Sequence, residues 1–294
     1  MSHRSIGSRM FDICNVIFMI IIILVFFLPF WIVISTSLVG SAESARRGAY
    51  QFIALQPDFN CYKVLLSGGS VIFKAYGVTI FRTIAGTALS LLCTVTLAYG
   101  LSKKSLPHRN AITAFVFFPM IFSGGMIPTY LLVHSVGIYD TMWALLLPAI
   151  ISVWNTLLMR NFFMEIPESL EESAKIDGAS TLCILFRIIL PLSLPSIATI
   201  GLFYAVGHWN AWFDAAMYIT NRSLYPLQLI LRNIVMAMSN ADINNLALNS
   251  MNDQPPTESM KCAAIIVTTL PIICVYPFIQ KYFVKGVMVG AVKG

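Results

Sequence analysis

The chain has 294 residues, of which 57% are hydrophobic and only 11% are charged, and its mean hydropathy is +0.78. Soluble globular domains are about 45–50% apolar and about 25% charged, so this composition excludes an ordinary soluble domain. A nucleic-acid-binding protein needs a basic face on a soluble domain, so the net charge of +6 predicts no nucleic-acid partner.

Six long stretches of the chain contain no Asp, Glu, Lys or Arg. A charged side chain at the bilayer centre costs roughly 2.5–3.5 kcal/mol, and a spanning helix needs about 20 apolar residues. We therefore predict an all-α membrane protein with six transmembrane helices. The uncharged stretches are residues 13–42, 83–102, 110–139, 141–159, 188–213 and 262–280.

The segments between these stretches predict the topology. Lys and Arg are concentrated on the side of both termini, as in "SKKSLPHRN", whereas the tight loop "SVGIYD" has neither. Cytoplasmic loops carry the excess of Lys and Arg, so both termini are predicted to be cytoplasmic. The expected organisation is one transmembrane domain of residues 1–294, with a core at 75–284, a cytoplasmic loop at 161–191 and outside loops at 42–74 and 220–259.

Two segments are expected to depart from regular helix. Gly124, Gly125 and Pro128 lie in the middle of the third stretch and predict a broken helix, which is tolerated at membrane depth only against protein or a water-filled cavity. The long outside loop 220–259 is polar and rich in Asn, and loops of this length are usually functional or disordered. The four His and six Cys have no metal-ligand spacing, so no metal site is predicted.

The cytoplasmic loop contains the charged stretch "EESAKIDGAS". Pro167 can open a helix, because its missing N–H is not needed in the first turn. Glu168 and Glu171 then lie near the positive end of the helix dipole, and Glu171 is four residues before Lys175, a favourable pairing. A short helix is therefore expected after Pro167.

The end of this helix is also predicted. Gly178 suits a left-handed helix end, and Ser180 can cap a second helix. Pro191 marks a break before the next span. The loop is therefore expected to be a rigid helix, glycine corner and helix on the cytoplasmic face.

These residues resemble a known family. Glu172-Ser173-Ala174, then Gly178, Ile188 and Leu190-Pro191, match the "EAA…G…I-LP" loop of ATP-binding-cassette (ABC) importer permeases, with Ser173 in place of the usual Ala. "AKIDGAS" is similar to the maltose-type carbohydrate permeases. The segments "FSGGMIPTYLLVHSVGIYDTMWALLLP", "GHWNAWFDAAMYI" and "QKYFVKGVMVGAVKG" resemble the branch that handles complex oligosaccharides, so the similarity extends over nearly the whole chain.

The resemblance implies a type I ABC importer permease fold, in which the hairpin is a coupling helix that docks on a cytoplasmic ATPase. Carried over to this chain, Glu172 pairs with a basic group of the ATPase, Ala174 permits close packing and Gly178 sets the corner, with Asp177 beside it and Pro191 closing the motif. The C-terminal residues 292–294 are expected to reach into the ATPase interface.

The chain has no P-loop, because no Gly-Lys dipeptide occurs in it. It is therefore predicted to be a transport subunit that binds no cofactor and catalyses no reaction, while a separate ATPase uses ATP and Mg. The resemblance implies a second, homologous permease in a heterodimer, two ATPase subunits, an extracytoplasmic solute-binding protein and an oligosaccharide cargo. Because the 220–259 loop faces the outside, it is expected to help receive the binding protein. The expected location is the bacterial cytoplasmic (inner) membrane.

Sugar sites combine aromatic faces with polar groups, and one segment of the fifth stretch offers both. It contains Trp209, Asn210, Trp212 and Asp214, with the two Trp three apart and so on one helix face. The alternative is an interfacial aromatic belt, with Asp214 at the membrane boundary. Tyr130 and Asn155 are further candidates for the substrate path, although polar groups on spans often only bond a neighbouring helix.

Arg82 is the one basic residue close to the expected cavity. It is expected either to extend toward lipid headgroups from the outer end of its helix, or to bind the carboxylate of an acidic sugar. Two other functions stay open at this point: the same machinery with a non-sugar cargo, and a secondary transporter driven by an ion gradient. The second requires ionisable residues near the midplane and inverted repeats, and the charge pattern indicates neither.

Overall fold

The computed structural model describes residues 6–48, 50–67, 70–245 and 256–291, which are helical except for loops and one isolated antiparallel bridge between Val39 and Pro57. The chain divides into two compact units. The first consists of Met1–Gly69 and Leu231–Pro271, and the second of Ser70–Ile230 and Ile272–Gly294. Helices α14 (Leu227–Asn245) and α15 (Thr257–Ala291) each run from one unit into the other. The expected ATPase-contacting tail, residues 292–294, lies outside the described residues.

The first unit contains α1 (Ile6–Ser37), α2 (Ser41–Arg47) and α3 (Asn60–Ser67). The apolar window of α1 has none of its residues buried within the protein, as expected for a helix that is hydrophobic on all sides and faces lipid or another chain. Beyond α1 the chain is held by polar contacts. Ser37 Oγ and Tyr62 OH are 2.7 Å apart, and Tyr50 OH donates to Glu258 Oε2 over 2.6 Å.

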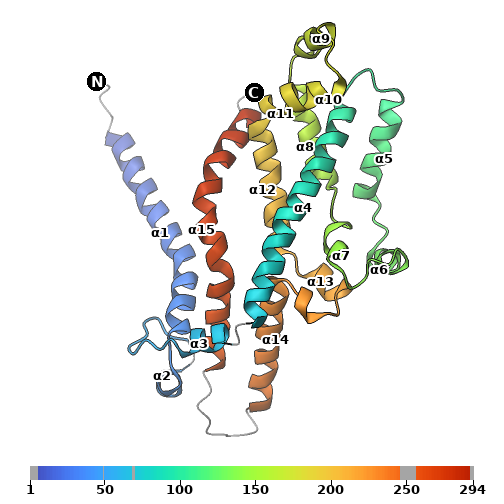
Figure 1. Cartoon of the computed structure of the whole chain (residues 1–294). Coiled ribbons are helices and arrows are strands. Elements are labelled where there is room, and N and C mark those ends of the chain that lie inside the picture. The colour runs from blue at the N-terminus through green and yellow to red at the C-terminus, as the bar shows by residue number, and fades with distance from the viewer. Residues whose placement is uncertain (1–5, 49, 68–69, 246–255, 292–294) are drawn as a thin grey trace. The chain divides into compact units, whose positions relative to one another are not determined.

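The second unit is built around α4 (Ser70–Ser102), which packs along α12 (Leu194–Asn210) and α8 (Val153–Met164). Within this unit, α9 (Glu168–Ile176) lies at the end where α4 finishes, and α13 (Phe213–Tyr218) lies toward the other end (Figure 1). The remaining elements are α5 (Arg109–Ile121), α6 (Met126–Ser135), α7 (Met142–Leu146), α10 (Thr181–Ile184), the π-helix η1 (Leu185–Ile189), α11 (Leu190–Leu192) and the 3-10 helix η2 (Arg222–Leu224).

Within the described residues, three helices are long and apolar enough to cross a membrane, and five spans result if each of two bent helix pairs counts as one. The long helices contain residues 13–37 of the first predicted stretch and all of the second and sixth. The fourth stretch, 141–159, is divided between α7 and α8 instead of forming one long helix. Pro148 lies between them, and its missing N–H and fixed φ interrupt the helix.

The predicted break in the third stretch is confirmed. Helices α5 and α6 meet at 112°, and Gly125, which precedes α6, has a φ of +88° that favours glycine. The fifth stretch is broken twice. Thr181–Leu192 meets α12 at 86° around Ser193, and α12 ends at Asn210 before α13 begins. Much of the segment expected as the outside loop 220–259 is helical, because α14 occupies 227–245.

Two apolar clusters hold the second unit together. The first joins α4, α8 and α12 to the 161–191 loop and contains Val95, Ala98, Tyr99, Met159, Phe163, Ala174, Ile184, Leu185, Ile189, Ile200 and Tyr204. The second, called the outer cluster here, joins α6 and α7 to α13 and contains Val133, Ala144, Leu145, Ala215, Tyr218, Ile219 and Leu229. The predicted loop at 161–191 is thus partly a core element and not a solvated connector.

Two isoleucines of this loop provide a matched test of its packing. Ile184 is fully buried, whereas Ile176 is 86% exposed. Ile184→Ala is expected to lower stability by about 2–5 kcal/mol, because truncation leaves a cavity in the core. Ile176→Ala is expected to leave the melting temperature of the purified protein unchanged. Equal effects of the two substitutions on that melting temperature would contradict the packing of the loop described here.

Candidate functional site

The corner between α9 and α10 has the geometry of a Schellman motif. The N–H of Gly178 donates to Lys175 O over 3.0 Å, and the N–H of Ala179 donates to Ala174 O over 2.9 Å. Gly178 has a φ of +79°, a region that residues with a Cβ rarely adopt. Ser180 then caps α10 by accepting from the N–H of Cys183 over 3.3 Å. The predicted helix, glycine corner and helix are confirmed.

Helix α9 begins at Glu168, with Pro167 at the preceding capping position. Its buried face carries Glu171, which is 8% exposed, and Ala174, which is 9% exposed and packs into the first apolar cluster. Glu172, Ser173 and Asp177 are exposed, as is most of Ile176. The small side chain of Ala174 therefore permits close packing within this chain, while the outer face stays open to a partner.

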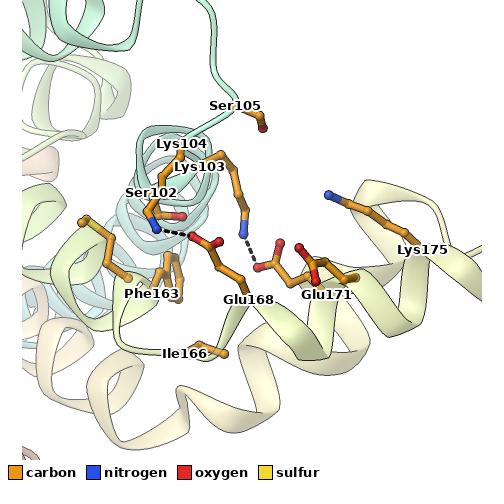
Figure 2. Close-up of a pocket in the computed structure, with 11 residues that line it drawn as sticks. Ser102, Lys103, Lys104, Ser105, Phe163, Ile166, Glu168, Glu171 and Lys175 are labelled. Carbon is orange, nitrogen blue, oxygen red and sulfur yellow. Dashed lines mark hydrogen bonds and ion pairs between the residues drawn. The ribbon is translucent and has the colours of Figure 1, made fainter.

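Two ion pairs join α9 to the end of α4. The Nζ of Lys103 donates to Glu171 Oε1, and Lys104 Nζ lies 2.8 Å from Glu168 Oε1 (Figure 2). The expected pairing of Glu171 with Lys175 is wrong, because Lys103 approaches the carboxylate from α4. Lys103 also lies over the ring of Tyr99, with its Nζ 4.1 Å from the ring centroid. Sequence spacing within α9 could not reveal a partner 68 residues away.

The two pairs differ in their burial. Glu171 and Lys103 are mostly shielded, with side chains 11% and 25% exposed, whereas Glu168 and Lys104 are open to solvent. The hydrogen bond and charge of Lys104 lower the pKa of Glu168, so this carboxylate is ionised at neutral pH. An exposed pair contributes little to stability, so Lys103–Glu171 is the stronger of the two links.

A pocket of about 250 Å³ lies between α9 and the end of α4 (Figure 2). Its walls carry charges of both signs from the two ion pairs, together with Glu172 and Lys175. The full lining is Ser102, Lys103, Lys104, Ser105, Phe163, Met164, Ile166, Glu168, Glu171, Glu172 and Lys175. The pocket marks the place where α9 is held to α4 mainly through side chains.

The helical segment Thr181–Leu192, which follows the glycine corner, contains a π-helical turn directly before Pro191. In η1 the N–H of Leu190 donates to Leu185 O, one residue farther back than in an α-helix. This widening gives room to the ring of Pro191, which would otherwise press on a carbonyl of the preceding turn. The 86° bend follows at Ser193, two residues after the break predicted at Pro191.

Arg82 is not at the edge of its helix. Helix α4 begins at Ser70, so Arg82 lies about three turns inside it, and its side chain is only 1% exposed. Both of its terminal nitrogens donate to the carboxylate of Asp214. The expected extension of Arg82 toward lipid headgroups is therefore wrong, because a carboxylate within the protein holds its charge. This pairing engages both terminal nitrogens, which a sugar carboxylate would otherwise bind.

The sequence spacing predicts that the two Trp residues share a helix face, and this prediction is wrong. Trp209 lies in the last turn of α12, whereas Trp212 precedes α13, and Ala211 between them is extended, with ψ of 125°. The physical reason lies on α4: Nη1 of Arg82 donates to Ala211 O over 3.1 Å. Asn210 Nδ2 donates to Val206 O of its own helix.

Some of the candidate substrate residues do lie together. Trp212 and Tyr130 pack against the outer cluster, and the ring centroid of Tyr130 is 6.3 Å from that of Tyr218 and 5.9 Å from that of Tyr139. Asn155 belongs to α8, where it is 6% exposed. Tyr139 was missed from sequence because it lies in the tight loop after α6, and nothing in its neighbours signals an aromatic cluster.

The chain is similar to known proteins over nearly its whole length. A family described as "Binding-protein-dependent transport system inner membrane component" matches residues 107–289. The chain is 44% identical to "Protein LplC" of Bacillus subtilis (strain 168), over 99% of this chain and 98% of that protein. It is 43% identical to "Polygalacturonan/rhamnogalacturonan transport system permease protein YtcP" of the same organism, over 98% and 99%.

A solved structure is similar over the same length. It is titled "Crystal structure of a bacterial ABC transporter involved in the import of the acidic polysaccharide alginate". The TM-score is 0.85 at 32% identity, and the match covers 96% of this chain and all of that chain.

The glycine corner can be tested by one substitution with a matched control. A Cβ at Gly178 meets no atom within 4 Å, so Gly178→Ala acts only through the left-handed backbone, at a cost of roughly 1–2 kcal/mol. Gly100 in α4 has equally open surroundings but a helical backbone, so Gly100→Ala is expected to be neutral or stabilising. Thermal melting of the purified protein measures the difference. Equal melting temperatures for the two variants would contradict the strain assigned to Gly178.

Proposed function

Because this chain belongs to the family of binding-protein-dependent transport inner membrane components, and is a permease subunit of an ABC importer, we propose that it carries an acidic oligosaccharide. The observation that carries the proposal is full-length similarity to two proteins named for anionic polymers, polygalacturonan in one case and alginate in the other. Family membership sets aside the secondary transporter driven by an ion gradient.

As a multi-pass inner membrane protein, the chain is proposed to cross the membrane six times with both termini in the cytoplasm. Three long helices and two bent pairs account for five spans. We assign the sixth to α7 and α8 together, because the segment 141–159 is free of charge although it is interrupted at Pro148. Irregular backbone is tolerated at that depth when it is buried against protein, and Leu145 and Leu146 beside it are almost fully buried.

The exposed face of α9 is proposed to dock on a cytoplasmic ATPase. Glu172 and Ser173 offer polar groups there, and Ile176 offers an apolar side chain that is 86% exposed at the end of the helix. A binding-protein-dependent importer implies an ATPase and a binding protein as partners. We infer that the full assembly has two ATPase subunits, which use ATP and Mg, and a second homologous permease that completes the path in a heterodimer.

The two faces of α9 suit it to transmit a movement of a docked ATPase to the transmembrane helices. An ATPase that shifts the exposed face also shifts Glu171 and Glu168, which are paired with the end of α4. A rigid helix passes such a shift along its length, whereas a flexible loop would absorb it. We therefore propose that α4 receives the motion and that the outer cluster responds to it.

The cargo proposal is tested by uptake in cells that lack this chain and in the same cells supplied with it. Labelled tri-galacturonate and alginate trisaccharide are the acidic probes, with maltotriose and a tripeptide as neutral and non-sugar probes. Uptake of an acidic probe is expected to be lost with the chain and restored with it, while the other two stay unchanged. Loss confined to maltotriose would assign a neutral sugar, and loss confined to the tripeptide would exclude a sugar cargo.

A further inference from the structure

The buried guanidinium of Arg82 is a group that docking on an ATPase does not explain. Ionisable residues within spans are costly and mark functional sites, and Arg82 lies inside the helix span Val71–Ser102. Its partner, Asp214, keeps a side chain that is 24% exposed, so the pair lies at the boundary between the protein interior and the accessible side of α13.

The bonds of Arg82 attach it to both sides of the break between α12 and α13. Nη1 donates to Ala211 O over 3.1 Å and to Asp214 Oδ1 over 3.2 Å, while Nη2 donates to Asp214 Oδ2. Ala211 directly follows α12, and Asp214 is in the first turn of α13, where its Oδ1 also accepts the N–H of Ala215 over 2.8 Å. One side chain of α4 therefore fixes where α12 stops and how α13 starts.

A second contact joins α4 to α12, one turn farther along α4. Gly86 and the ring of His208 approach so closely that a Cβ at Gly86 would lie 2.6 Å from His208 Nε2. Both Nε of Arg82 and Nε2 of His208 are buried without a hydrogen-bond partner in the described part of the chain. Buried polar atoms left unpaired are costly, so this cluster is not arranged for stability alone.

Energetics favour a positioning role for the pair. Replacing a buried ion pair by apolar residues is often neutral or stabilising, so the pair itself is weak evidence of stabilisation. What the guanidinium supplies is a fixed geometry, because its planar fork binds a carboxylate through two bonds at once. Trp212, between the two bonded residues, packs against the outer cluster together with Tyr130.

We propose that Arg82 and Asp214 form a positioning pair for the transport path, which fixes the α12–α13 break, and with it Trp212 and the outer cluster, to α4. Arg82 acts through Asp214 and Ala211 and does not contact the cargo. At 1.5 Å per residue, Arg82 lies roughly 30 Å along α4 from Lys103, which is paired with α9. One continuous helix thus links the coupling loop to the break, whatever the cargo is.

The test uses the full chain reconstituted with its partner permease, ATPase and binding protein in proteoliposomes. The variants are Arg82→Gln, Asp214→Asn and the reciprocal exchange Arg82→Asp with Asp214→Arg. Each single change is expected to lower maximal uptake per ATP hydrolysed by roughly tenfold or more, because one charge of the pair loses its partner and the break loses its fixed position. The concentration of binding protein that gives half-maximal ATPase activity is expected to stay unchanged. The exchange is expected to restore much of the lost uptake, since the two bonded groups are again present.

Matched variants separate positioning from other roles. Arg47→Gln removes an arginine from a local pair with Glu43 in α2 and is expected to leave uptake per ATP unchanged. Gly86→Ala changes no charge but separates α4 from His208, so it is expected to reproduce the loss even if Arg82→Gln fails to assemble.

Three results would overturn the proposal. Normal uptake per ATP in Gly86→Ala or in both single variants would remove the positioning role. A reciprocal exchange no better than the single changes would show that the pairing itself is not what matters. A defect of Arg82→Gln confined to anionic cargo, with a raised KM and unchanged maximal rate, would make Arg82 a cargo-binding residue.

Discussion

Backbone polar groups within a membrane protein must be satisfied by the protein itself, and this constraint decides where the helices of this chain can break. Three of the interruptions between helices have an identifiable partner within the described residues. The carbonyl of Ala211 accepts from Arg82, the N–H of Leu227 donates to Thr79 Oγ1 over 2.8 Å, and the N–H of Ser152 donates to Tyr204 OH over 3.0 Å. Arg82 and Thr79 both belong to α4, and Tyr204 OH is itself 2.6 Å from Thr94 of α4.

The end of α4 next to α9 follows the same rule. The carbonyl of Leu101, in its last turn, accepts from Arg109 Nε over 3.0 Å and from Arg160 Nε over 3.1 Å. Positive groups are favoured at a helix C-terminus, so these arginines also suit the dipole of α4. The unbroken helix therefore supplies side chains to the broken ones along its length and receives two basic side chains at its end. Helix α4 therefore contacts α9 at one end and the α12–α13 break farther along, so it joins these two parts of the unit directly.

Features that depend on local chemistry could be predicted from the sequence. The left-handed corner at Gly178 and the cap at Ser180 need only neighbouring backbone atoms, and the break at Gly124–Gly125 needs only residues that do not hold a helix. Features that depend on distant partners could not. The spacing of four residues predicts a pair between Glu171 and Lys175, whereas the observed partner, Lys103, follows another helix. The uncharged stretch that predicts the second span begins directly after Arg82, which places this residue at a helix end. The helix α4 begins at Ser70, about three turns before Arg82.

The transport role followed from motif spacing together with full-length similarity, but the path inside the protein did not. Trp209 and Trp212 have the spacing of one helix face, yet the bond from Arg82 to Ala211 ends α12 between them. Such long-range bonds override periodicity and leave no local signal. The partly buried pair between Lys103 and Glu171 is another such long-range contact. The proposal that α4 transmits the motion of the ATPase rests on this pair.

The most direct test of that claim compares uptake with ATP hydrolysis in proteoliposomes containing Lys103→Glu, Glu171→Lys or both. Each single change places like charges together, so ATP hydrolysis is expected to continue while uptake per ATP falls by roughly tenfold or more, and the double exchange should recover it. Normal uptake per ATP in both single variants would contradict the role of α4 as the link.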